Sequence, residues 1–101
     1  MNMLMLVFRS SLKERVHGLL EQCDVRAYTE IPETIGAGQT GSAEGGSFYP
    51  DVNSVILVAV DDAHAERVER SVKAWCDEVT QRAGGQKPSI TLFIWPCKQL
   101  I

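Results

Sequence analysis

Hydrophobic residues are arranged along this chain in short continuous runs and in helically spaced stripes. One continuous run of strand length covers Met3–Phe8, and another strand is predicted over Val52–Val60, with the apolar run Val55-Ile56-Leu57-Val58 at its centre. A third run, Ile90–Trp95, stops at Pro96, which cannot donate to a strand ladder. Runs of this length, bounded by polar or turn residues, are typical of buried β-strands. A further strand is predicted over Val25–Ile31, where apolar and polar residues alternate.

Two other segments space their apolar residues as amphipathic helices do. The first carries Leu12, Val16, Leu19 and Leu20, and the second carries Val68, Val72, Trp75, Cys76 and Val79. Positions separated by three, four, seven or eight residues share one face of a helix, so each set predicts a buried stripe.

Polar residues beside these stripes predict the helix ends. Ser11 and Glu14 fit the capping-box pattern, in which each side chain satisfies the other residue's free backbone N–H. Asp61 and Asp62 supply acidic groups at the start of the second helix, where they complement the helix dipole. The second helix is predicted to end at Ala83-Gly84-Gly85.

The resulting order is β-α-β-β-α-β, the ferredoxin-like pattern of the α+β class. It predicts an antiparallel four-stranded sheet with two helices on one face, because both crossovers are right-handed. A length of 101 residues fits a single domain spanning residues 1–101.

The strands of this predicted sheet are apolar on both faces. A sheet with one wet face alternates apolar and polar residues, but Met3–Phe8, Val55–Val60 and Ile90–Trp95 do not, apart from Thr91. Monomers rarely expose an apolar patch larger than a few hundred Å². We therefore expect a homo-oligomer packed sheet to sheet.

A long polar insertion separates the second and third strands, from about Thr34 to Val52. It has no Lys or Arg and five glycines: Gly36, Gly38, Gly41, Gly45 and Gly46. Hairpins normally close with two to five residues, and much longer loops in compact domains are often functional. We expect function to reside at or near this loop.

Composition narrows the functional classes. A net charge of −3 and ten scattered Lys and Arg residues argue against nucleic-acid binding, which needs clustered positive charge. The three cysteines are far apart, and the apolar start is too short for a secretory signal or a membrane span. We expect reduced thiols and a cytoplasmic location.

Candidate ligand-binding residues gather in two glycine-containing segments. Around the loop they are Thr29, Gly36, Gly38, Gln39 and Thr40, and after the second helix they are Gly84, Gly85 and Lys87. Glycine lets backbone N–H groups approach an anion, but the same glycines equally serve turns that need positive φ. Lys87 and Arg82 are candidate phosphate partners, and Arg82 is also explained by the helix dipole.

Neither enzymatic chemistry nor a metal site is indicated by the spacing of reactive residues. His17 and His64 have no second ligand at helical spacing, and the cysteines form no CxxC pair. No catalytic triad or phosphate-loop signature is present, so we expect no enzyme activity and no bound metal.

The order of these features resembles that of PII-like proteins, relatives of the nitrogen-regulatory PII signal transducers. The matching segments are Val25–Tyr28, Gly36-Ala37-Gly38, Gly41, Gly45-Gly46, Tyr49-Pro50, Val55–Val60, Asp61-Asp62 and Phe93-Ile94-Trp95-Pro96. The resemblance implies a homotrimer that binds a small effector, usually an adenine nucleotide (ATP, ADP or AMP), between subunits. It further implies that the long loop, the family's T-loop, docks on a partner such as a membrane transporter.

One segment departs from the family pattern. After the second helix, nitrogen-regulatory members carry a glycine-rich phosphate-binding segment, whereas this chain has Arg82-Ala83-Gly84-Gly85-Gln86-Lys87. Two alternatives therefore stay open. Besides the nucleotide-binding hypothesis, one is a metal-binding trimer resembling CutA proteins of copper tolerance, and the other is an interaction module whose loop docks a partner without any ligand.

Overall fold

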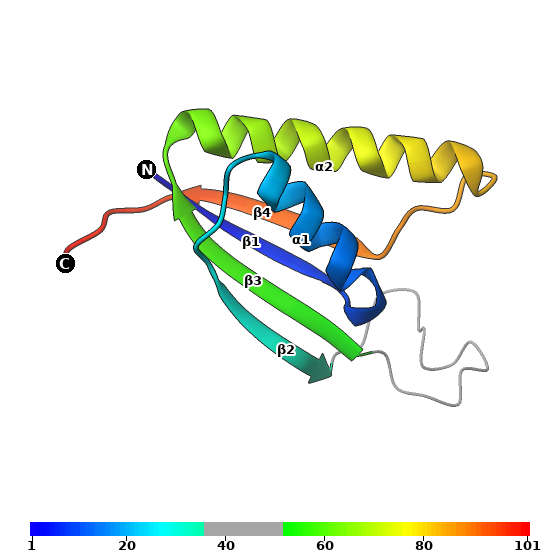
Figure 1. Ribbon diagram of the computed structural model, residues 1–101, viewed down its shortest axis with the longest axis horizontal. Helices are drawn as coiled ribbons and strands as arrows, with labels where there is room; N and C mark the ends of the chain where they lie inside the picture. Colours follow the sequence, from blue (N-terminus) through cyan, green and yellow to red (C-terminus); the bar gives the residue numbers. More distant parts are fainter. Residues whose placement is uncertain (36–51) are drawn as a thin grey trace.

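The computed structural model describes residues 1–35 and 52–101. It contains one four-stranded sheet and two α-helices (Figure 1). In chain order the elements are β1 (Asn2–Arg9), the 3₁₀ helix η1 (Ser10–Leu12), α1 (Lys13–Gln22), β2 (Thr29–Ile35), β3 (Val52–Val60), α2 (Asp62–Arg82) and β4 (Ile90–Pro96). The strand order is β2-β3-β1-β4, and every neighbouring pair is antiparallel. The predicted βαββαβ fold is confirmed.

The prediction of the second strand was wrong in its position, because α1 ends in a Schellman turn. Asp24 adopts a left-handed φ of 60°, and its N–H donates to the Glu21 carbonyl. The N–H of Val25 reaches back 2.9 Å to the Leu20 carbonyl, the second bond of that motif. Val25 is therefore a buried residue of the turn that ends α1, and the strand begins only at Thr29.

The capping box predicted for the first helix was also wrong. The chain makes a 3₁₀ turn first, and α1 begins at Lys13 after Leu12, which provides no side-chain cap. The hydroxyl of Ser10 instead lies 3.0 Å from the hydroxyl of Ser54, a buried residue of β3. This contact satisfies a polar group in the core and fixes the start of α1 against the sheet.

The predicted acidic cap of the second helix is confirmed. The Asp61 carboxylate accepts a bond of 2.8 Å from the backbone N–H of His64, and the His64 Nδ1 lies 2.7 Å from the same oxygen. Both hydrogen bonds lower the pKa of Asp61, and the bond from the backbone N–H of His64 has the larger effect.

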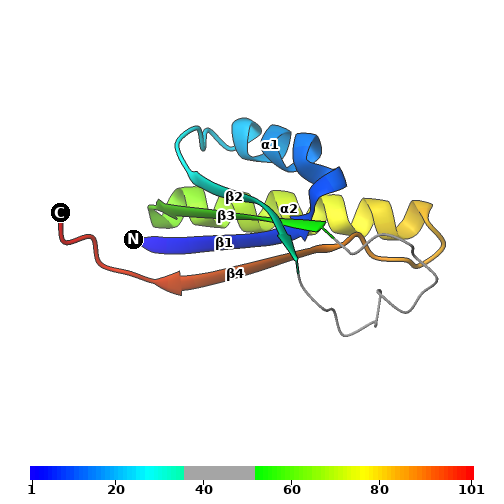
Figure 2. The same cartoon turned by 90° about the horizontal axis from the view of Figure 1, so that it is seen from below.

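Both helices lie on the same face of the sheet, and on the other face no described segment covers the strands (Figure 2). The core lies between helices and sheet, where Leu4, Leu6 and Phe8 alternate with residues that point to the opposite face. That uncovered face carries Met3, Met5, Val7, Val55, Leu57, Phe93 and Trp95. Phe93 is 51% exposed and Trp95 41%, so the chain presents the apolar face that the sequence predicted.

The strand β2 is irregular just before the segment that lies outside the described residues. Its register against β3 shifts between Ile31 and Thr34, so that one extra residue is accommodated as a bulge. Pro32 lies inside the bulge, and Glu33 has a left-handed φ of 58°.

Candidate functional site

The turn between α2 and β4 contains three of the predicted ligand-binding residues. Gly84 and Gly85 have φ values of 67° and 99°, which side chains rarely tolerate, and the N–H of Gly85 donates to the Thr80 carbonyl at 2.8 Å. Lys87 follows in the same turn and is exposed. The Arg9 N–H donates to the Ser89 carbonyl at 3.0 Å, which ties the end of the turn to β1.

Two cavities flank this turn, and Lys87 lines both of them. The first, here called the edge cavity, has a volume of about 520 Å³ and lies between α2 and the outer strand β4. Its lining residues include Lys73, Cys76, Asp77, Thr80, Ile90 and Leu92. Because β4 is an outer strand of the described sheet, the edge cavity lies at an edge of the sheet.

The thiol of Cys76 belongs to the edge cavity. Burial raises its pKa, the nearby Asp77 carboxylate raises it further, and the positive charge of Lys87 works in the opposite direction. The thiol is therefore a protonated, weakly nucleophilic group at neutral pH. Lys87 itself lines the same cavity.

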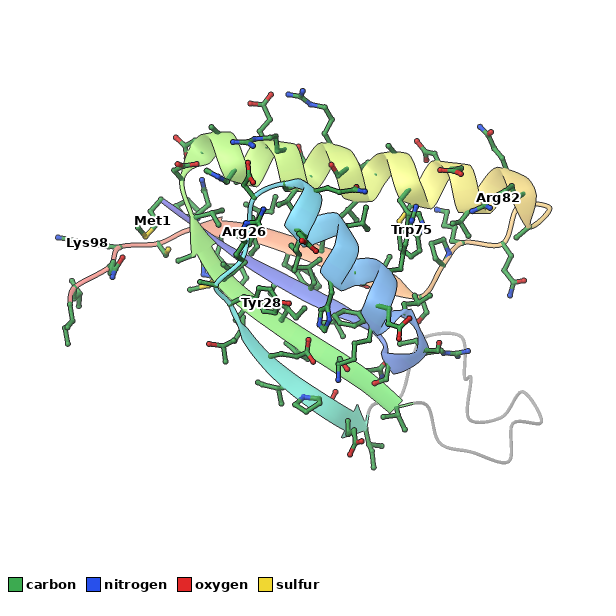
Figure 3. All side chains as sticks on the ribbon, in the orientation of Figure 1. Met1, Arg26, Tyr28, Trp75, Arg82 and Lys98 are labelled. Atoms are coloured by element: carbon green, nitrogen blue, oxygen red, sulfur yellow. The ribbon has the colours of Figure 1, made fainter. Side chains whose placement is uncertain are left out.

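The second cavity, here called the helix-side cavity, is larger, at about 1150 Å³. It lies between the start of α1, the end of α2 and the turn that leads to β4. Among the residues that the structure describes, its lining contains four cationic side chains and one acidic one: Arg9, Arg15, Arg82, Lys87 and Glu78. Trp75 projects from α2 toward the sheet and Arg82 lies at the end of the same helix (Figure 3), while the Arg15 guanidinium lies 6.0 Å from the Trp75 ring.

The structure does not bring all predicted site residues together in one chain. Thr29 opens β2, the outer strand on the opposite edge of the sheet from β4, so it lies away from the Gly84–Lys87 turn. The remaining candidates lie outside the described residues: Gly36, Gly38, Gln39 and Thr40. The residues that flank them, Ile35 and Val52, lie at the end of the sheet where β1 meets the start of β4.

A polar cluster attaches β2 to α1. The Glu30 carboxylate accepts a hydrogen bond of 2.5 Å from His17 Nε2, and its other oxygen lies 3.2 Å from Lys13 Nζ. The His17 ring also lies 5.8 Å from the ring of Tyr28. Partial burial alone would raise the pKa of Glu30, but the hydrogen bonds and charges of His17 and Lys13 together lower it. The strand that leads to the long loop is thus held to the helix by charge.

Sequence reasoning missed Arg9, Arg15 and Trp75 as cavity residues. Arg15 precedes the buried Val16 on α1, and Trp75 belongs to the buried stripe of α2, so each appeared to be explained by its own helix. Their meeting depends on how the two helices pack, which no local pattern reveals.

Histidine, cysteine and acidic side chains do not gather into a metal-binding group in the described part of the chain. Within residues 1–35 and 52–101, no three His, Cys, Asp or Glu side chains lie close enough together to hold an ion. The CutA-like alternative therefore receives no support from these residues. In the same ranges, neither helix combines the length and hydrophobicity that crossing a membrane requires.

No protein-family model matches the sequence, and no curated protein matches it either. Solved structures do match. One is CPII, a nitrogen regulatory PII-like protein from Thiomonas intermedia K12, whose structure was solved with ADP, AMP and bicarbonate. Its sequence is 18% identical to this chain, and the two structures align with a TM-score of 0.68 over 93% of this chain and 82% of CPII. Another structure of CPII, with ADP and bicarbonate, is 21% identical, with a TM-score of 0.64 and the same coverage.

A PII-like signalling protein from Thermus thermophilus matches as well. It is 16% identical, with a TM-score of 0.59 over 93% of this chain and 83% of that one. At these identities the similarity shows the fold, and the chain therefore has the fold of PII-like proteins, as its sequence predicted.

Proposed function

We propose that this chain is a PII-like regulatory protein that forms a homotrimer and binds an adenine nucleotide between subunits. The observation that carries the proposal is the placement of the Gly84–Lys87 turn and the edge cavity beside β4, an outer strand with an uncovered apolar face. Packing of that face against other copies would bury Phe93 and Trp95 and place a neighbouring chain against the cavity.

The chemistry of the edge cavity suits a nucleotide. Apolar residues of β4, such as Ile90 and Leu92, offer a surface for a base, and Lys73 and Lys87 offer positive charge for phosphates. ADP and AMP are bound in solved structures of the same fold, which supports this choice of ligand. The neighbouring chain would contribute residues that one copy holds far away, among them Thr29.

The regulatory output would pass through the segment between β2 and β3, as the resemblance implies. A ligand can bias that segment only by binding one of its states better than another. We expect a cytoplasmic protein without enzyme activity, whose target is a partner protein such as a membrane transporter.

Isothermal titration with ATP, ADP and AMP, with and without Mg²⁺, tests nucleotide binding. We expect saturable binding near one site per chain, and a loss of affinity in Lys87→Ala. Lys98→Ala is the matched control, since Lys98 is an exposed lysine outside both cavities. If none of the three nucleotides binds, the proposal that the ligand is an adenine nucleotide is refuted. A monomeric mass by light scattering would refute the proposal that the chain forms a trimer.

A further inference from the structure

Sulfur-bearing side chains gather at one end of the uncovered sheet face. Met3 lies opposite Trp95 in the pairing of β1 with β4. One row further, the Cys97 N–H donates to the Met1 carbonyl at 3.1 Å, so these two residues also lie opposite each other. Because successive residues of a strand point to alternate faces, Met1 and Cys97 share the face of Met3 and Trp95. The strand register thus brings three sulfur-bearing side chains and an indole together.

This sulfur cluster, defined as Met1, Met3 and Cys97, is accessible from solvent in one chain. Met1 is 50% exposed, Met3 and Cys97 are half-buried, and Cys97 is a free thiol. Met1 and Lys98, which directly follows Cys97, lie at the same end of the molecule (Figure 3). None of the three residues lines the edge cavity or the helix-side cavity. The cluster is therefore separate from the Gly84–Lys87 turn, which precedes the other end of β4.

The spacing allows the three sulfur atoms to reach a single ion. Directly opposed residues of two antiparallel strands have Cβ atoms about 5 Å apart. Residues two positions apart on one strand, such as Met1 and Met3, are separated by about 7 Å. A methionine side chain has three rotatable bonds, so its sulfur can move into gaps of this size. The cluster can therefore close around one ion without a change in the backbone.

The chemistry of these groups favours a soft, monovalent cation. Thioether and thiolate sulfurs are soft ligands and select Cu(I) among the biological metals. The face of a tryptophan ring attracts a cation that lies within about 6 Å of its centroid, and Trp95 stands opposite Met3. Zn²⁺ instead prefers thiolate, imidazole and carboxylate ligands, of which the cluster offers Cys97 alone. The ligand set thus discriminates between the two metals.

We propose that Met1, Met3 and Cys97 form a binding site for one Cu(I) ion, with the Trp95 ring beside it. Cys97 binds as the thiolate, and its proton passes to solvent when the metal enters. Cu(I) with one thiolate and two neutral thioethers carries no net charge, so the complex suits an apolar surface. Histidine spacing and CxxC pairs give no sign of this site, because its ligands meet through strand register.

Anaerobic titration of the full chain with Cu(I), in competition with a chromophoric Cu(I) chelator, tests the proposal. We expect one Cu(I) per chain, displacement by Ag(I), and no displacement by excess Zn²⁺. Losing a residue that only supports a metal ligand costs about 10–100-fold in affinity. Cys97→Ser and Met3→Leu remove ligands, so each should weaken Cu(I) at least about tenfold.

Met5→Leu and Cys76→Ser are the matched controls, and both should keep the wild-type affinity. Met5 lies on the same face in the next row, opposite Phe93, and Cys76 lines the edge cavity. Leucine nearly preserves the volume of methionine, so neither methionine variant should change the mass measured by light scattering. Unchanged affinity in Cys97→Ser, or equal losses in Met3→Leu and Met5→Leu, would overturn the site. Folded wild-type protein that leaves all Cu(I) with the chelator would overturn it as well.

Discussion

Replacing Glu30 with glutamine removes the charge that holds β2 to α1 while preserving the size of the side chain. Glu30 is 17% exposed and lies between His17, at 2.5 Å, and Lys13, at 3.2 Å. A hydrogen bond to a charged group contributes about 1.5–3 kcal/mol when buried, whereas an exposed ion pair contributes about 0.2–1 kcal/mol. Because Lys13 is 43% exposed and His17 35%, we expect a total loss of about 1–2 kcal/mol in unfolding free energy.

The pH dependence follows from the lowered pKa of Glu30. A carboxyl whose pKa is lower in the folded state contributes stability above its ordinary value of 4.5, and this stability is lost as pH falls through the folded value. The difference between wild type and Glu30→Gln should therefore be present above about pH 5 and disappear in stronger acid.

Denaturant unfolding at a series of pH values measures this difference, at one protein concentration because association changes apparent stability. Glu33→Gln is the matched control, since Glu33 is an exposed glutamate of the same strand. An equal loss in both variants, or a Glu30→Gln deficit that persists unchanged in strong acid, would refute the assignment of the stability to this charge cluster.

Three further substitutions test the fold and its assembly. Phe93→Asp should dissociate the proposed oligomer, because it places a carboxylate on an apolar face, and light scattering over a concentration series would show the smaller mass. Gly84→Ala should cost about 1 kcal/mol in denaturant unfolding, because Gly84 has a φ of 67°. Phe8→Ala should cost about 3–5 kcal/mol in the same assay, because Phe8 is 1% exposed in the core.

Two of these substitutions have a comparison that separates the intended cause from general damage. Ala74→Asp adds the same charge on the exposed surface of α2 and should leave the mass unchanged. Gly18→Ala should stabilise by about 0.5–1 kcal/mol, since Gly18 lies inside α1 with open space at its Cβ. Destabilisation by Gly18→Ala equal to that by Gly84→Ala would contradict the backbone explanation.

The sequence predicted what depends on local periodicity. The strand Val52–Val60 and the stripe of Val68, Val72 and Trp75 were confirmed, because burial on one or both faces of an element dictates which positions are apolar. The end of α2 was also predictable, since Gly84 and Gly85 mark positions that need positive φ.

Errors arose where a residue acted against its usual preference or through a distant partner. Asp24 takes the left-handed position that glycine usually marks, so the alternating pattern after it was mistaken for a strand. Ser10 pairs with Ser54, which is forty-four residues away in the sequence. No local pattern reveals this contact, so the sequence favoured the cap at Ser11 instead. Arg9 and Arg15 likewise meet only through tertiary packing, so the helix-side cavity had no sequence signal.

The bulge in β2 restricts how copies of this protein can join. A continuous β-ribbon grows only when both outer strands of a sheet accept another strand, and one of the two outer strands here is interrupted by Pro32 and the shifted register after Ile31. Strand addition is thereby discouraged at β2 and left to β4. A sheet that can accept a further strand at one edge alone cannot grow into a fibre by repeated strand addition.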